Sequence, residues 1–385
     1  MTPGARIAAA IAVLDDVLSG EPAEKVLTTW ARRNRYAGSG DRAAIRDHVY
    51  DALRCRRSFA WMGGAETGRG LMLGALRAEG VDPSDLFNGE GYAPAPVAAD
   101  ETGNDLADAP RAVRLDMPDW LMAPLADSLG DGLEPALATL RTRAPVFLRV
   151  NLARGDLAEA QRVLASDGIE TRPNPLAQTA LEVTANPRRV AQSQAYRDGL
   201  VELQDASSQA ACAAVPVQPG DRVLDYCAGG GGKALALAAR GARVTAHDTD
   251  PRRMRDIPVR ADRAGVAIVT EASVPASDRF DLVLCDVPCT GSGTWRRTPE
   301  AKWLLTPERL DALCQMQAEI LTTASRHVKP GGHLVYMTCS LLDAENAGQI
   351  EKFLGDTEGW TLTFSQRFSP VDGGDGFFVA VLSAS

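Results

Sequence analysis

The sequence predicts an α/β protein, with a doubly wound, mostly parallel sheet in its C-terminal half. From Asp221 onward, short apolar strands alternate with helices, which is the pattern of a parallel sheet. The N-terminal third instead has apolar residues at helical spacing, and we expect it to be all-α. A small α+β module is predicted between the two. The 385 residues also exceed one ordinary domain, so we expect two or three.

The first 140 residues are predicted to form the helical domain. Helical periodicity covers residues 5–20, 23–36 and 40–58, and Asp41 after a glycine-rich stop suits a helix cap. Several arginines make this region locally basic, which fits either a solvated helical face or an RNA-contacting surface. The acidic stretch 83–112 is rich in Pro and Gly and is predicted to be a loop or linker.

Residues 141–205 are predicted to be the small α+β module, with a strand, a helix and further short strands. The remaining domain, 206–385, is predicted to contain the parallel sheet. Its expected strands are 222–227, 242–248, 266–272, 280–286, 331–339, 360–364 and 376–382. Its expected helices follow the glycine loop and cover much of 251–265, 307–328 and 343–355.

Composition restricts the class of protein. A formal charge of −9 argues against a protein that coats nucleic acid through bulk charge, but permits an enzyme with local basic patches. Seven scattered cysteines without a CxxC pair indicate free thiols in a reducing, cytoplasmic setting. We expect no zinc or other metal site, no membrane span and a monomer.

A glycine-rich loop follows the first strand of the predicted parallel sheet, in "DYCAGGGGK" (225–233). Ligands bind at such carboxyl ends, and glycines let the backbone approach them closely. The loop fails the phosphate-binding P-loop pattern because Cys227 replaces its first glycine and Ala234 follows Lys233. Asp248, at the end of the next strand, stands where a carboxylate accepts hydrogen bonds from ribose. Loop and acid together predict an adenosine-type cofactor without saying which one.

Two cysteines stand at the ends of two further predicted strands. Cys289 lies in "CDVPCTGSG", where Pro, Gly and Ser keep the backbone irregular, and Cys339 lies in "MTCS". Both should face the same sheet edge as the glycine loop, so we expect them to be functional. Cys55 is expected to be structural. Buried, inert thiols are expected at Cys212, Cys285 and Cys314.

These motifs resemble one family. "DVPCTGSGTWRRTPE" and "YMTCSLLDAEN", with "DYCAGGGGK" upstream, are similar to the RsmB/Nop/Sun family of S-adenosylmethionine-dependent RNA cytosine-5 methyltransferases. "GDRAAIRDHVYDALRCRRS" resembles the NusB-like, RNA-binding helical domain of bacterial members, and "LRVN" and "LQDASSQA" resemble the family's central module. The resemblance covers nearly the whole chain and implies a Rossmann-like class I methyltransferase domain.

The resemblance also implies roles for individual residues. Cys339 would be the nucleophile that adds to carbon 6 of cytosine, Cys289 would assist product release, and Asp286 would hydrogen-bond the base and lie beside the cofactor. S-adenosylmethionine would be held by a set of loop and strand-end residues: Cys227, Ala228, Gly229, Gly230, Gly231, Gly232, Lys233, Asp248, Glu271 and Asp286.

Two departures from the family pattern stand out. Gly230 occupies a position where the family usually has proline, and Glu271 stands near the position where the family has an aspartate that contacts the adenine side of the cofactor.

Arg296 and Arg297, next to Trp295, are predicted to contact RNA phosphates, with the tryptophan available for stacking. Alternatively, these two arginines lie in a loop exposed to solvent and bind no RNA.

The expected substrate is cytosine in 16S ribosomal RNA, as for bacterial relatives with the NusB-like domain, and transfer RNA stays open. A methyltransferase acting on an exocyclic amine is disfavoured because Cys289 stands where its second proline would be. A non-catalytic, RNA-binding ribosome-assembly factor is the alternative from another class.

Overall fold

The structure is a computed structural model that describes residues 1–385, and it divides into two compact units. The helical unit contains residues 1–126, 131–143 and 295–304, and the sheet unit contains 127–130, 144–294 and 305–385. The predicted α+β module therefore groups with the parallel sheet, and ten residues from the middle of the C-terminal region group with the helices. The three-domain division stays a prediction.

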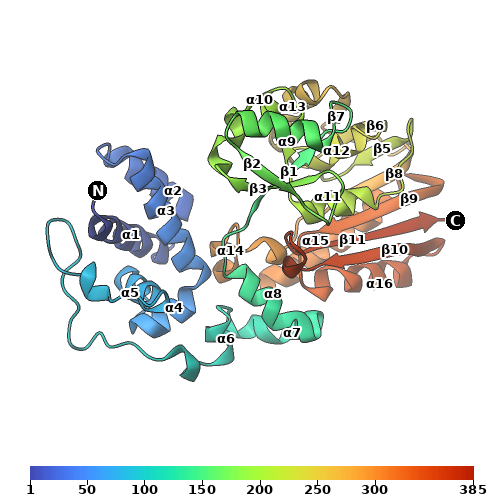
Figure 1. Cartoon of the computed structure of the whole chain (residues 1–385). Helices are drawn as coiled ribbons and strands as arrows, with labels where there is room; N and C mark the ends of the chain where they lie inside the picture. Colours follow the sequence, from blue (N-terminus) through green and yellow to red (C-terminus); the bar gives the residue numbers. More distant parts are fainter. The chain divides into compact units, whose positions relative to one another are not determined.

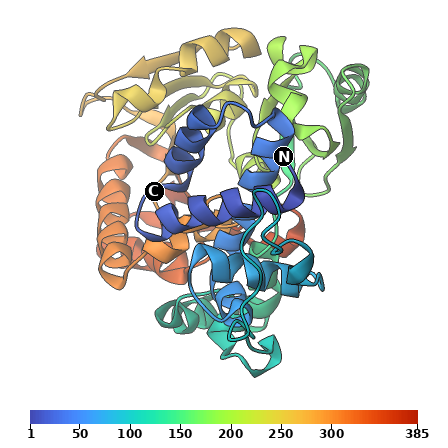
Figure 2. The same ribbon diagram turned by 90° about the vertical axis from the view of Figure 1, so that its left-hand side faces the viewer.

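Helices α1–α5 lie together in the helical unit, labelled in Figure 1 and drawn in blue tones in Figure 2, and their buried apolar side chains form one core. Two of the three predicted N-terminal helices are confirmed. The third ends at Arg54, and a new helix starts at Arg56. The helices are α1 (Pro3–Leu18), α2 (Ala23–Arg33), α3 (Ser39–Arg54), α4 (Arg56–Gly63), α5 (Gly68–Ala78), α6 (Arg111–Arg114), α8 (Leu133–Leu140) and α14 (Glu300–Leu304), with α7 (Met122–Leu129) at the boundary. Glycines allow α4 and α5 to approach closely, since a Cβ on Gly74 would lie 1.9 Å from the Phe59 carbonyl oxygen.

Residues 295–304 complete the end of α3. Nζ of Lys302 donates to the Arg54 carbonyl at 2.8 Å, and Nε1 of Trp303 donates to the Leu53 carbonyl at 2.7 Å. The last carbonyls of a helix have no partner within the helix, and a cation there also interacts favourably with the helix dipole. Lys302 is fully buried, and this burial lowers its pKa to about 8. The segment that follows the Cys289 loop is therefore anchored in the helical unit.

The sheet unit begins with a four-stranded antiparallel sheet of order β2-β3-β1-β4. Its elements are β1 (Val146–Val150), α9 (Leu157–Ser166), β2 (Glu170–Pro173), β3 (Ala180–Ala185), α10 (Gln194–Arg197) and β4 (Val201–Leu203). The buried Arg149 extends from β1 and donates to Gln204 Oε1 at 2.7 Å and to the Gly232 carbonyl at 2.8 Å. This small sheet thus supports the end of the glycine loop.

The large sheet has seven strands in the order β10-β11-β9-β8-β5-β6-β7. Strands β5 to β9 are parallel, and β11 runs antiparallel to β9 and β10, which confirms the predicted fold class. The strands are β5 (Arg222–Asp225), β6 (Arg243–His247), β7 (Ile268–Glu271), β8 (Phe280–Asp286), β9 (Val328–Thr338), β10 (Trp360–Phe368) and β11 (Phe377–Ala384).

Helices cover both faces of this sheet (Figure 1), which explains why the central strands are continuously apolar. They are α11 (Ala206–Ala213), α12 (Gly232–Ala238), α13 (Ile257–Ala264), α15 (Pro307–Ser325) and α16 (Ala347–Asp356). The connection from β7 to β8, residues 272–279, contains no helix. None of the helices in the structure combines the length and apolarity that crossing a bilayer requires.

The chain order reverses between β5 and β8, which are neighbours in the sheet although β6 and β7 lie between them in sequence. At such a switch point the loops after adjacent strands diverge and leave a crevice for ligands. The glycine loop follows β5, and the Cys289 loop follows β8.

Candidate active site

The glycine loop turns sharply between β5 and α12 and contacts the predicted acid. Gly229 and Gly231 have φ values of 50° and 80°, and a Cβ on Gly231 would lie 2.8 Å from a side-chain carbon of Ile257. The N–H of Gly229 donates to Oδ2 of Asp248 at 2.9 Å. Asp248 is 2% exposed and also pairs with Nη1 of Arg253 at 2.9 Å. The glycine loop and Asp248 are therefore in direct contact.

The other residues of the glycine loop differ in their exposure to solvent. Cys227 is half-buried, Ala228 is buried, and Gly232 opens α12. Burial and nearby carboxylates raise the pKa of Cys227, so its thiol stays protonated. Gly230, where the family usually has proline, is exposed, and its carbonyl accepts a hydrogen bond from Arg260.

Lys233 connects the glycine loop to the end of β8. Its Nζ lies 2.5 Å from Oδ2 of Asp286. Burial opposes the charge on Lys233, but Asp286, together with Cys212 and Asp225, outweighs burial, and the net effect is a raised pKa. The ammonium group is therefore retained and holds the Asp286 carboxylate at the sheet edge.

Asp225 is a buried acid at the end of β5 that the sequence reasoning did not single out. It is fully buried, and neither carboxylate oxygen has a hydrogen bond of good geometry, although the Ala234 N–H approaches it. Burial, and next the charge of Asp286, raise the pKa of Asp225 to about 7. An unsatisfied acceptor beside a glycine loop suits a cationic ligand. The sulfonium and ammonium groups of S-adenosylmethionine have that charge, so the site fits this cofactor.

The two predicted cysteines meet. The parallel pairing of β8 with β9 brings their carboxyl ends together, and Sγ of Cys289 lies 3.5 Å from Sγ of Cys339. Both residues are half-buried. The hydrogen bond with Cys339, and then burial, raise the pKa of Cys289 well above its usual range. Cys289 is thus a thiol that can donate to the sulfur of Cys339.

The other thiols differ from this pair. Cys55, Cys212 and Cys285 are buried, and burial raises the pKa of each. The expectation of a buried thiol at Cys314 is wrong, because it lies half-buried on α15, with Sγ donating to the Ala344 carbonyl at 3.5 Å.

Glu345 forms hydrogen bonds with both loops that carry the predicted cysteines, and the sequence alone did not identify it as a site residue. Its fully buried carboxylate accepts from the N–H of Thr290 at 2.8 Å, from the hydroxyls of Thr290 and Ser340, and from Nε2 of Gln317 at 3.0 Å. Thr290 and Ser340 each directly follow one of the two cysteines. An acid six residues beyond Cys339 was the available signal, but only the fold reveals its partners.

Replacing Glu345 by alanine is expected to lower the free energy of unfolding by about 3–5 kcal/mol, because several buried donors lose their acceptor. Glu345→Gln keeps one acceptor oxygen and should lose about 1–2 kcal/mol. Urea unfolding followed by circular dichroism measures both values. Glu351→Ala, at an exposed position on α16, is the control and should change stability by less than about 0.5 kcal/mol. If Glu345→Ala has the same unfolding free energy as the wild-type protein, Glu345 does not stabilise the two cysteine loops as described.

Glu271, Arg296 and Arg297 are the other predicted site residues. Glu271 ends β7, is exposed, and pairs in register with His247, next to Asp248. Arg296 is only 3% exposed, its carbonyl accepts from Nε of Arg54, and Trp295 is also buried. This burial argues against direct RNA contact by Arg296 or stacking by Trp295, and leaves the half-buried Arg297 as the candidate.

Comparisons with known proteins agree with this geometry. A family model described as 16S rRNA methyltransferase RsmB/F matches residues 212–383, and one described as the RsmF/B-like ferredoxin-like domain matches residues 117–191. Ribosomal RNA small subunit methyltransferase B of Xylella fastidiosa (strain 9a5c) is 36% identical over 286 residues, which cover 69% of this chain and 68% of the relative.

The enzyme of the same name from Vibrio cholerae is 34% identical over 288 residues, 71% of this chain, and the match spans 66% of that relative, just under two thirds. The crystal structure of a methyltransferase homolog protein from Pyrococcus horikoshii has a TM-score of 0.63 and 25% identity, over 71% of this chain and 97% of that one. The chain therefore belongs to the RsmB/F family of S-adenosylmethionine-dependent methyltransferases.

Proposed function

We propose that this protein is an RNA cytosine-5 methyltransferase that modifies 16S ribosomal RNA through a covalent cysteine adduct. The observation that carries the proposal is the pair of thiols, 3.5 Å apart, at the same sheet edge as Asp286. Methyl transfer to an exocyclic amine needs no nucleophilic thiol and would leave both sulfurs unexplained. The names of the curated relatives support ribosomal RNA of the small subunit as the substrate.

Cys339 is the nucleophile in this proposal. Carbon 5 of cytosine is a weak nucleophile, and addition of the Cys339 thiolate to carbon 6 converts the ring into an enamine whose carbon 5 is electron-rich. The thiol of Cys289 donates a hydrogen bond to the attacking sulfur before addition. Carbon 5 would then form a bond to the methyl group while the bond between that group and the sulfonium sulfur breaks, which leaves a neutral thioether, and the ring keeps the carbon–sulfur bond at carbon 6.

Cys289 completes turnover. The largest cause of its raised pKa is its hydrogen bond with Cys339. Once the Cys339 sulfur is bonded to carbon, that sulfur carries no negative charge, and this cause weakens. The pKa of Cys289 then falls, its thiol loses its proton to solvent, and the resulting thiolate can accept the proton on carbon 5. Removal of that proton restores the 5,6 double bond and expels the Cys339 thiolate, so atoms and charge balance.

Asp286 positions the base. Its carboxylate lies at the end of β8 and is held by Lys233 at 2.5 Å. It can accept a hydrogen bond from the exocyclic amine and, once ring nitrogen 3 has taken a proton from solvent, from that N–H as well. This proton cancels the negative charge that thiolate addition places on the ring, and it returns to solvent when the adduct breaks down. Lys233 acts through Asp286 by fixing the direction of the carboxylate.

The cofactor would lie along the glycine loop, with Asp248 at its ribose and Asp225 and Asp286 near its charged groups. S-adenosylmethionine supplies a methyl group activated by a sulfonium centre. The chain's own contribution is to place that group beside the base and to balance its charge with carboxylates. Glu271 would contact the adenine of the cofactor, because it ends β7, which pairs with β6, the strand that Asp248 follows.

The test is product analysis. Purified protein is incubated with in vitro transcribed 16S rRNA and S-adenosylmethionine, and the nucleosides are identified by mass spectrometry. We expect 5-methylcytidine at one position, located by bisulfite sequencing. A product of N4-methylcytidine, or transfer to transfer RNA alone, would overturn the proposed chemistry or the proposed substrate respectively.

A further inference from the structure

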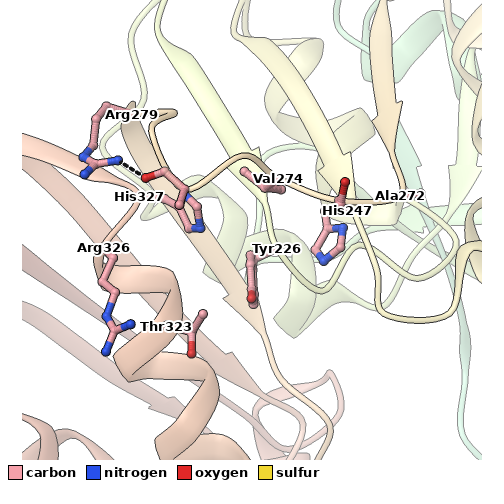
Figure 3. Close-up of a pocket in the computed structure, with 10 residues that line it drawn as sticks. Tyr226, His247, Ala272, Val274, Arg279, Thr323, Arg326 and His327 are labelled. Carbon is pink, nitrogen blue, oxygen red and sulfur yellow. Dashed lines mark hydrogen bonds between the residues drawn. The ribbon is translucent and has the colours of Figure 1, made fainter.

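A pocket of about 500 Å³ lies between the end of α15 and the β7–β8 connection (Figure 3). Its wall includes no acidic side chain and contains two arginines and two histidines. The lining residues are Tyr226, His247, Ala272, Ser273, Val274, Ala276, Arg279, Thr323, Arg326 and His327. None of them has a role in the proposed methyl transfer.

The pocket follows from the sheet topology. Chains returning from β5, β6 and β8 to the next parallel strand each pass through a helix, which covers a sheet face. The return from β7 to β8 has only residues 272–279 and no helix, although it must pass β6 and β5. The sheet beside α15 is therefore left without a helical cover, and Tyr226 and His247 border the resulting space.

One end of the pocket is cationic. Arg326 is exposed after the last turn of α15, and Arg279 is exposed just before β8. Nη1 of Arg279 is oriented by the carbonyls of Ala276 and Asp278 at 2.7 and 3.0 Å. In Figure 3 both guanidinium groups lie on the same side of the pocket. In a chain with a net charge of −9, two arginines on a wall without carboxylates form a local site for an anion.

The other end is aromatic. The Tyr226 ring lies 5.2 Å from the His247 ring and 6.2 Å from the His327 ring, measured between centroids. Tyr226 is half-buried, so part of its ring is accessible. Aromatic faces of this kind stack on nucleobases. The hydroxyls of Ser273 and Thr323 add hydrogen-bonding groups at the wall.

We propose that this pocket holds one nucleotide of the substrate RNA, with its phosphate at Arg279 and Arg326 and its base against Tyr226. The inference rests on the proposed function and adds an RNA contact outside the cytosine site. Tyr226 and His247 each directly precede a residue of the cofactor site, Cys227 and Asp248. An occupied pocket would therefore lie directly behind the cofactor loop.

The experiment measures the affinity of the full-length protein for in vitro transcribed 16S rRNA by filter binding, with S-adenosylhomocysteine present, over a range of salt concentrations. Arg326→Ala removes a charge at an exposed position, and Ala276→Trp fills the pocket without removing a charge. Arg309→Ala, exposed at the other end of the same helix, is the matched control.

We expect Arg326→Ala to weaken RNA binding about 5- to 10-fold and to reduce the salt slope by about 0.7, as for one lost phosphate contact to single-stranded RNA. Ala276→Trp should also weaken binding and lower the salt slope, because the filled pocket no longer accepts the nucleotide and its phosphate, and Arg309→Ala should change neither the affinity nor the slope. Unchanged affinity in both pocket variants would overturn the inference while the proposed methyl transfer stands.

Two further outcomes would also overturn it. A weaker affinity for S-adenosylhomocysteine in Arg326→Ala would assign the pocket to the cofactor. Saturable binding of free cytidine 5′-monophosphate that Ala276→Trp abolishes, with RNA binding unaffected, would assign it to a free nucleotide. If the wild-type protein binds no RNA at all, the proposed function fails together with the inference.

Discussion

Replacement of Cys339 by serine is expected to reduce methyl transfer to 16S rRNA by at least about 1,000-fold, because a hydroxyl is a far weaker nucleophile toward carbon 6. The side chains are nearly isosteric, and Cys339 is half-buried at the end of β9, so the fold should persist. Transfer of a radiolabelled methyl group to RNA measures the loss. Binding of S-adenosylhomocysteine by calorimetry should stay unchanged.

Cys314→Ser is the matched control, since that thiol is also half-buried but lies on α15 and donates to the Ala344 carbonyl, whereas the partner of Cys339 is Cys289. It should keep wild-type activity. The covalent mechanism is wrong if Cys339→Ser turns over at the wild-type rate, and this result would not affect the assignment of the family.

Replacement of Cys289 by alanine is expected to have a different result: accumulation of a covalent protein–RNA complex. The nucleophile and the cofactor site are intact, so methyl transfer to carbon 5 proceeds once. The thiol 3.5 Å from Cys339 that we propose to remove the carbon 5 proton is missing, so the carbon–sulfur bond should persist. Denaturing gel electrophoresis should reveal a slowly migrating species that ribonuclease removes, and steady-state turnover should fall by about 100-fold or more.

The double variant Cys289→Ala/Cys339→Ala is the control for that complex. It should form none, since no sulfur remains to bond the ring. Rapid multiple turnover by Cys289→Ala, or a covalent complex in the double variant, would show that the two thiols do not have the proposed division of roles.

The parallel sheet, the glycine loop with Asp248 and the approach of two cysteines could all be predicted from the sequence. Each depends on local pattern plus one rule, that carboxyl ends of parallel strands share an edge. Glu345 could not be recognised, because its partners come from the loops after β8 and β9 and from α15. Asp225 could not be recognised for a similar reason. Only the three-dimensional structure shows that its carboxylate is buried without a hydrogen-bond partner.

Arg296 illustrates the opposite error. An Arg-Arg pair beside a tryptophan is typical of a nucleic-acid surface, but the segment is used for packing, and the Arg296 carbonyl accepts from Arg54. Sequence pattern cannot tell a basic residue in solvent from one that completes a distant helix end. The pocket behind the glycine loop was likewise unpredictable, because it depends on a helix that the β7–β8 connection does not form.

The position of residues 295–304 also bears on how the protein folds as it is made. Lys302 and Trp303 supply the groups that satisfy the last carbonyls of α3, yet about 250 residues separate them from that helix. A growing chain that has released only its first 143 residues from the ribosome lacks these groups, so the last two carbonyls of α3 do not yet have these donors. The end of α3 therefore acquires its final hydrogen bonds only after the segment that directly follows the Cys289 loop has been synthesised.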